Sequence, residues 1–130
     1  MTMMTNKEFE NMFLNVAVND KYRERIAYEL GSKKKREKAI WRFSHHPTMY
    51  LNLDDRYYQV LKKEQLWNSL DNDGDTFYLL SLDYPNGIIF NKQKTFDYLC
   101  FSDVTLVIGK HAFFIKEEPE RQFLVHIIRF

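Results

Sequence analysis

The chain has 130 residues, of which 45% are hydrophobic and 28% charged, and its formal net charge at pH 7 is +1. This composition excludes a disordered chain or one embedded in a membrane, and the length suits a single domain over residues 1–130. A charge so close to zero does not indicate a particular class of partner. The only cysteine, Cys100, lies in an apolar run, so an intrachain disulfide is excluded and a reducing compartment is expected.

The N-terminal segment does not have the pattern of a signal peptide, because Lys7, Glu8 and Glu10 interrupt its apolar residues. No run in the chain approaches the roughly 18 apolar residues of a membrane span. We therefore expect a cytoplasmic protein that has no membrane partner.

Two helices are predicted at the start of the chain. Thr5 and Glu8 have the spacing of a capping box, and apolar residues follow at helical spacing to about Asn19. Asp20 is expected to cap a second helix with an apolar face of its own. Gly31 lies where a left-handed residue would end that helix.

A third helix is predicted from Ser32, as its cap, to Pro47, which ends it because the residue before a proline avoids the helical region. Its apolar edge is narrow and contains Ile40 and Phe43. Four cations follow on another side at helical spacing, and they are Lys34, Lys38, Arg42 and His45. A solvated polar face is the simplest interpretation of these cations.

The middle of the chain, residues 54–70, allows two interpretations. Asp54 and Asp55 could cap one helix through this segment, or the charged residues 62–64 could break it. The sequence leaves open whether residues 54–70 form one helix.

A turn is predicted over the acidic residues 71–75, and strands are predicted after it. Residues 76–84 are rich in types that favour strands, and the sequence Tyr-Pro-Asn-Gly at 84–87 predicts a hairpin turn that returns through residues 88–90. Residues 104–108 and 111–116 are expected to form a second hairpin.

Two further apolar runs complete the predicted elements. Residues 96–101 suit either a strand or one helical turn, whereas residues 122–130 have apolar residues on both faces and predict a central strand. Together these elements predict an α+β fold with a helical N-terminal half packed on an antiparallel sheet of about five strands.

No motif indicates catalysis or a bound cofactor. The acidic segment Asp71–Asp75 does not fit a calcium loop, because neither register supplies both the glycine and the glutamate that such a loop needs. The chain contains no HExxH or CxxC sequence and no nucleotide-binding glycine motif. His45 and His111 could serve a metal-free nuclease as acid and base, although their spacing does not require it. We expect a protein that is not an enzyme and that holds no metal or cofactor.

Charge is unevenly distributed along the chain. Residues 1–46 contain 10 Lys and Arg against 6 Asp and Glu, whereas residues 47–130 contain 9 against 12. The segment Glu64–Phe90 contains five acidic residues and no Lys or Arg. Such asymmetry favours association with a charged partner and sets its orientation. The predicted contacts with a basic protein partner are Asp71, Asp73, Asp75, Glu117 and Glu118.

A small nucleic-acid-binding protein that uses the basic helix Lys33–His46 is the alternative interpretation. Its predicted phosphate contacts are Lys34, Lys38, Arg42 and His45. Trp41 would stack on a base in this interpretation. However, the chain has no RRM, KH or zinc-finger signature, and its net charge is low for a nucleic-acid binder. A protein partner is therefore preferred.

The sequence Ser-Lys-Lys-Lys-Arg at Ser32–Arg36 is followed by Trp-Arg-Phe-Ser-His-His at Trp41–His46. A helix of this form, in a short α+β chain without enzyme motifs, resembles the immunity proteins of bacterial contact-dependent growth inhibition systems. The resemblance implies a stoichiometric inhibitor that binds a cognate toxin domain, usually a nuclease, in the cytoplasm of the producing cell. It carries over no catalytic residue and no contact residue.

Overall fold

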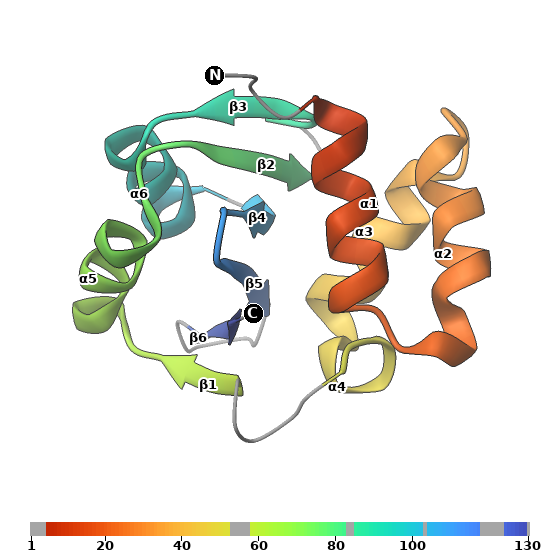
Figure 1. Cartoon of the computed structure of the whole chain (residues 1–130), viewed down its shortest axis with the longest axis horizontal. Coiled ribbons are helices and arrows are strands. Elements are labelled where there is room, and N and C mark those ends of the chain that lie inside the picture. Colours follow the sequence, from red (N-terminus) through yellow and green to blue (C-terminus); the bar gives the residue numbers. More distant parts are fainter. Residues whose placement is uncertain (1–4, 53–57, 83–84, 103, 118–123, 130) are drawn as a thin grey trace.

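The computed structural model describes residues 5–52, 58–82, 85–102, 104–117 and 124–129. A sheet lies between two layers of helices (Figure 1). The helices are α1 (Asn6–Val16), α2 (Asp20–Gly31), α3 (Arg36–His45), α4 (Pro47–Tyr50), α5 (Lys63–Asp73) and α6 (Lys92–Phe101). The strands are β1 (Tyr58–Leu61), β2 (Phe77–Ser81), β3 (Ile88–Phe90), β4 (Val104–Ile108), β5 (Ala112–Glu117) and β6 (Leu124–Arg129).

All neighbouring strands of the sheet are antiparallel, and their order is β1-β6-β5-β4-β2-β3. Helices α1 to α4 cover one face of the sheet, and α5 and α6 cover the other (Figure 1). The predicted α+β fold with a helical N-terminal half is confirmed, with six described strands where about five are expected. The second helical layer is a feature that the sequence pattern does not predict.

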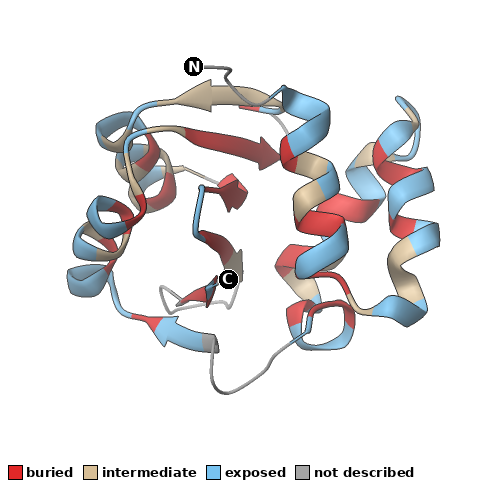
Figure 2. Cartoon of the chain, viewed as in Figure 1, coloured by how far each residue is buried: buried red, intermediate tan, exposed pale blue. Residues whose placement is uncertain are grey.

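The central strands β2, β4 and β5 are buried on both faces, so neighbouring residues of one strand enter different cores. In β2, Tyr78 and Leu80 pack among α1 to α4, whereas Phe77 and Leu79 pack against α5 and α6. Figure 2 shows the central strands buried between helices whose outer faces are exposed, whereas β3 is intermediate and β1 is largely exposed. Full burial of a side chain of this size contributes about 1.5–3 kcal/mol, so both helical layers stabilise the sheet.

Phe13 attaches α1 to the core. Its ring makes edge-on contacts with Phe43 of α3, at a centroid distance of 5.1 Å, and with Phe113 of β5, at 5.2 Å. This edge-to-face geometry is the one that aromatic quadrupoles favour. Ile40 and Phe43 are fully buried, so the predicted apolar edge of α3 does pack on the sheet.

The first two helices begin close to the predicted residues. The side chain of Thr5 accepts a hydrogen bond from the backbone N–H of Glu8 (3.2 Å), as the capping-box spacing predicts. Asn19 rather than Asp20 caps α2, because the Asn19 side chain accepts the N–H of Lys21 (3.1 Å).

The expectation that Gly31 ends α2 in a left-handed conformation is wrong. Gly31 is the last residue of α2, and the described glycines with positive φ are Gly74 and Gly87. Ser32 follows with extended backbone angles, and its N–H donates to the carbonyl of Glu29 (3.2 Å). An extended Ser32 is sufficient to end the helix without a left-handed residue.

Helix α3 begins three residues later than predicted, at Arg36 rather than Lys33. Lys33–Lys35 form a turn instead. In this turn the carbonyl of Ser32 accepts the N–H groups of Lys35 (3.2 Å) and Arg36 (2.9 Å). Lys34 is therefore outside the helix and is not aligned with the other three predicted cations. Pro47 follows the end of α3 as predicted, and it is also the first residue of α4, where proline is favoured.

The described part of residues 54–70 does not form one helix. A strand, β1, ends at Leu61, and α5 begins at Lys63. The break therefore lies at residue 62, within the charged residues 62–64 that are one of the two predicted possibilities. The expected caps Asp54 and Asp55 lie outside the described residues.

The acidic segment is a turn only at its end. Helix α5 continues through Asp73, and Gly74, with φ of 146°, ends it. Asp71–Asp73 are thus helical, which corrects the prediction of a turn over residues 71–75. Glycine adopts this positive φ without a Cβ clash.

The second half of the chain follows the predicted hairpins. β2 pairs with β3, and β4 pairs with β5, in antiparallel register. Residues 96–101 belong to α6, which settles their ambiguous pattern in favour of helix. β6 pairs with both β1 and β5, so the predicted central strand is confirmed. None of the helices in the described ranges has the length and apolar character needed to cross a bilayer.

Candidate functional site

Asp73 joins the end of α5 to the turn between β4 and β5. It is only 7% exposed, and its two carboxylate oxygens accept the backbone N–H groups of Lys110 (2.8 Å) and His111 (2.7 Å). Gly109 lies so close that a Cβ at this position would overlap with the carboxylate. Asp73 therefore stabilises the turn and does not lie on the surface, where a partner could contact it.

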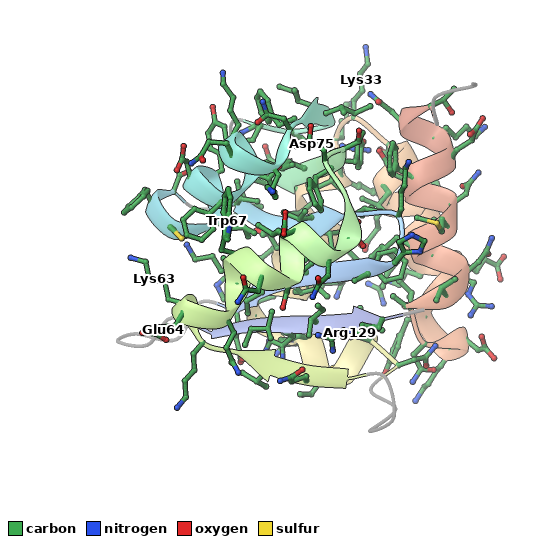
Figure 3. The ribbon with its side chains drawn as sticks, turned by 60° about the vertical axis from the view of Figure 1, so that its left-hand side comes forward. Lys33, Lys63, Glu64, Trp67, Asp75 and Arg129 are labelled. Carbon is green, nitrogen blue, oxygen red and sulfur yellow. The ribbon has the colours of Figure 1, made fainter. Side chains whose placement is uncertain are left out.

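Asp71 and Asp75 are exposed, and both bind Lys92, the first residue of α6. The Lys92 ammonium group forms an ion pair with Oδ1 of Asp71, and its backbone N–H donates to Oδ1 of Asp75 (3.1 Å). The ammonium nitrogen also lies 4.7 Å from the ring centroid of Trp67, a cation–π contact. Figure 3 shows Trp67 on α5 and Asp75 just beyond one end of that helix. These contacts fix two carboxylates, the acidic pair Asp71 and Asp75, at the end of α5.

The acidic pair is only partly neutralised. Lys92 is the first cation after the segment Glu64–Phe90 and supplies one positive charge beside two negative ones. Among the contacts of the described residues, Oδ2 of Asp71 accepts no hydrogen bond, and the Asp71 side chain is 57% exposed. Glu64 is in the first turn of α5 and lies at the other end of the helix, so it does not join the pair (Figure 3).

The other predicted acidic contacts do not belong to this group. Glu117 is the last residue of β5, six residues after His111, which corresponds to about 20 Å along a strand. Its Oε2 lies 2.6 Å from Nε2 of the buried His126 in β6. Glu118 lies outside the described residues. The structure thus brings the three predicted aspartates together and separates Glu117 from them.

The predicted phosphate contacts do not form one cationic surface. Lys34 lies in the turn before α3, and Lys38 is exposed on the helix. Arg42 donates to both carboxylate oxygens of Glu29 (3.0 Å each) and to the hydroxyl of Tyr50 (3.0 Å). Hydrogen bonding to Glu29 raises the pKa of Arg42. A guanidinium that is engaged in this way is not available to a phosphate group.

Trp41 is an exposed aromatic residue of α3, with 43% of its surface accessible. Its ring stacks on His45 at a centroid distance of 4.3 Å and meets His46 edge-on at 5.5 Å. Nδ1 of His45 also lies 3.0 Å from the carbonyl oxygen of Trp41. An open pocket of about 670 Å³ lies beside this ring, and its lining residues are Glu37, Lys38, Trp41, Arg42 and Leu82. The sequence signal for this pocket is a tryptophan placed outside the apolar edge of the helix.

A largely buried polar cluster of Glu10, Arg36 and Tyr78 connects α1, α3 and β2. The Arg36 guanidinium donates to both carboxylate oxygens of Glu10 (3.0 and 2.7 Å) and to the Tyr78 hydroxyl (3.2 Å), which itself donates to Glu10. Arg36 also binds the carbonyl of Leu30 (2.8 Å) and the side chain of Asn86 (3.2 Å). Burial and the hydrogen bond to Glu10 raise the pKa of Tyr78. The sequence pattern does not predict this cluster, although an arginine in line with the apolar edge of α3 is a signal for it.

The described residues contain no group of three or more His, Cys, Asp or Glu side chains that could hold a metal ion. Burial raises the pKa of the Cys100 thiol, which disfavours the reactive thiolate. His111 contributes its backbone N–H to Asp73, and His45 packs on Trp41.

No family model, no curated protein and no solved structure matches the chain. Two surfaces that include residues predicted as contacts lie on opposite sides of the sheet. One is the acidic pair at the end of α5, and the other is the Trp41 pocket beside α3.

Proposed function

We propose that the protein is a cytoplasmic immunity protein that binds a cognate toxin domain with nuclease activity and neutralises it by occluding its active site. The observation that carries the proposal is the exposed carboxylate of Asp71, held beside Asp75 by Lys92. The resemblance of Ser32–Arg36 and Trp41–His46 to growth-inhibition immunity proteins points to the same class of function.

The acidic pair has the chemistry that a nuclease inhibitor needs. A nuclease active site presents cations to the phosphates of its substrate, and a carboxylate of an inhibitor can occupy the place of a phosphate. Electrostatic complementarity of this kind increases the association rate and sets the orientation of the complex. Oδ2 of Asp71 is the acceptor that we assign to the toxin's cations, because Oδ1 is engaged by Lys92.

The contacts around Lys92 reduce the cost of binding. The acidic pair is held by side chains and backbone of two helices, α5 and α6, before any partner arrives. A group that is already ordered loses less conformational entropy when it forms a complex. Lys92, which is 22% exposed and lies against Trp67, keeps the carboxylates in place while a partner approaches from solvent.

Asp73 and Glu117 are not part of the proposed interface. Asp73 is buried against the β4–β5 turn. Glu117 is at the far end of β5, about 20 Å from that turn, and its carboxylate contacts His126. The nucleic-acid alternative has no comparable support, because Arg42 is bound to Glu29 and Lys34 lies outside the helix.

The test is coexpression with a candidate toxin domain, which is sought as the variable C-terminal domain of a large secreted protein encoded by the neighbouring upstream gene. The toxin domain is expected to stop growth, and this chain is expected to restore it. The double variant Asp71→Ser/Asp75→Ser should restore growth poorly, whereas the control Glu24→Gln, at an exposed position on α2, should behave as wild type.

Two outcomes separate the parts of this proposal. Growth that stays arrested in the presence of folded wild-type protein contradicts the immunity function. Full protection by Asp71→Ser/Asp75→Ser leaves the immunity function intact and removes the acidic pair as its contact surface.

A further inference from the structure

The Trp41 pocket is a second surface, independent of the acidic pair. It lies on the side of the sheet that α1 to α4 cover, whereas the acidic pair lies at the end of α5 on the opposite side (Figure 1). Its volume of about 670 Å³ is within the range of binding pockets in proteins. Trp41 is about half exposed at the edge of this pocket. Tryptophan is among the residue types most enriched at the positions that contribute most of the binding energy in protein interfaces.

Two side chains that line the pocket, Arg42 and Trp41, are held by contacts within the protein. Arg42 is fixed by three hydrogen bonds, two to Glu29 and one to Tyr50. The Trp41 ring is fixed by its stack on His45, at an interplanar angle of 15°. A partner group that enters the pocket therefore meets ordered side chains and little conformational entropy is lost on the protein's side.

The turn that leads into α3 and the adjoining pocket wall carry exposed lysines. Lys33, Lys34 and Lys35 are exposed in the turn before α3, and Lys38 is exposed in the pocket wall. Glu37 is the only exposed carboxylate of this segment. Because Arg36 and Arg42 are neutralised by Glu10 and Glu29, four lysines against one glutamate leave a local excess of three positive charges.

We infer that this surface docks an acidic peptide segment of a partner protein. An apolar or aromatic side chain of the segment packs on Trp41 and Leu82 in the pocket, and its carboxylates contact Lys38 in the pocket wall and Lys34 in the turn that leads into α3. The charge of the turn selects an acidic segment, and the indole ring selects an apolar anchor within it.

Nucleic acid fits this surface less well than an acidic peptide does. Both guanidinium groups of the segment, which would be the strongest phosphate ligands, are bound to carboxylates. Glu37 lines the pocket itself and would repel a phosphate placed over Trp41. A peptide can place an uncharged side chain over Trp41 and its carboxylates at the lysines. A nucleic acid carries one phosphate per nucleotide, so it has fewer ways to keep negative charge away from Glu37.

The test uses a pool of synthetic peptides of about twelve residues, each with one central Leu, Phe or Trp flanked by Asp and Glu. A matched pool carries Asn and Gln in place of the acids. Fluorescence polarisation at about 50 mM salt is expected to show that the acidic pool binds at least fivefold more tightly than its matched pool. Trp41→Ala and, separately, Lys34→Glu/Lys38→Glu are each expected to weaken that binding by about tenfold.

Two variants of α6 are the matched controls. Phe101→Ala truncates an aromatic residue that is 75% exposed, and Lys94→Glu makes a similar charge change, both on the other face of the sheet. Neither is expected to change peptide affinity. Because all the substituted side chains are exposed or partly exposed, circular dichroism should show folded protein in every case.

Three results would overturn the inference. One is equal affinity for the acidic and the matched pool, and another is unchanged affinity in the Lys34→Glu/Lys38→Glu variant. The third is a single-stranded DNA of the same length that displaces the acidic peptides and binds more tightly, which would assign the surface to nucleic acid.

Discussion

The carboxylate of Asp73 occupies the space in which a side chain at Gly109 would have to lie. Asp73 is at the end of α5 and Gly109 is at the end of β4, so this contact fixes the second helical layer against the sheet. The two N–H groups that follow Gly109, those of Lys110 and His111, both point at the same carboxylate. One buried side chain thus satisfies the donors of a tight turn and locates a helix.

Replacement of Asp73 by Ala is expected to destabilise the protein by about 2–4 kcal/mol, because two backbone N–H groups lose their acceptor in a buried place. Asp75→Ala, which removes an exposed carboxylate, is expected to cost less than about 1 kcal/mol. Urea unfolding followed by circular dichroism measures both values. Similar, small losses in the two variants would contradict the structural role of Asp73.

The ion pair between Glu29 and Arg42 is expected to behave as a buried pair. The two side chains are 5% and 17% exposed, so Glu29→Ala, which leaves the guanidinium without its partner, should cost about 3–5 kcal/mol. The double variant Glu29→Ala/Arg42→Met should be less destabilised than the sum of its single variants by about 1–3 kcal/mol. A double-mutant cycle in urea measures this coupling, and strict additivity would show that the pair is not coupled.

The hydroxyl group of Tyr78 is expected to make stability depend on alkaline pH. Its pKa is raised in the folded protein, so the folded state keeps this proton where the unfolded chain loses it. Stability from this group is therefore fully present below the unfolded value of about 10 and falls as the pH rises above it. Tyr78→Phe removes the hydroxyl and this dependence together.

The Tyr78→Phe variant is expected to be about 1–2 kcal/mol less stable than wild type near neutral pH, because Glu10 and Arg36 lose a hydrogen-bond partner. This difference should narrow above a pH of about 10. Urea unfolding midpoints of wild type and Tyr78→Phe, measured near neutral pH and above a pH of about 10, give the comparison. A difference that stays constant or widens would argue against a raised pKa at this hydroxyl.

The ends of several elements are predictable from single residues. Thr5 and Glu8 locate the start of α1, and Pro47 locates the boundary between α3 and α4, because each acts through its own backbone neighbourhood. The second helical layer is not predicted, although β2, β4 and β5 all carry apolar residues on both faces. Such strands must be covered on both sides, so these three strands carry the signal for a second helical layer, as residues 122–130 do for a central strand.

The candidate sites are less predictable, because charge along the chain does not show which charges meet in space. Lys92 lies next to a segment without cations, yet it folds back onto Asp71 over 21 residues. Arg42 is in line with exposed lysines in the helical pattern, yet it binds Glu29 on another helix. Only the three-dimensional arrangement separates Asp73, which is buried, from Asp71 and Asp75, which are exposed.

The most direct measurement of the proposed function is calorimetric titration of a purified candidate toxin domain with this protein. The candidate is the partner captured from the producing cell, or the C-terminal domain of a large secreted protein if the neighbouring upstream gene encodes one. We expect one-to-one binding, and we expect the toxin domain to lose its nuclease activity at the same stoichiometry. Asp71→Ser/Asp75→Ser should weaken the affinity by about tenfold or more, with Glu24→Gln unchanged. The contradicting result is a folded wild-type protein that neither binds the toxin domain nor inhibits its nuclease activity.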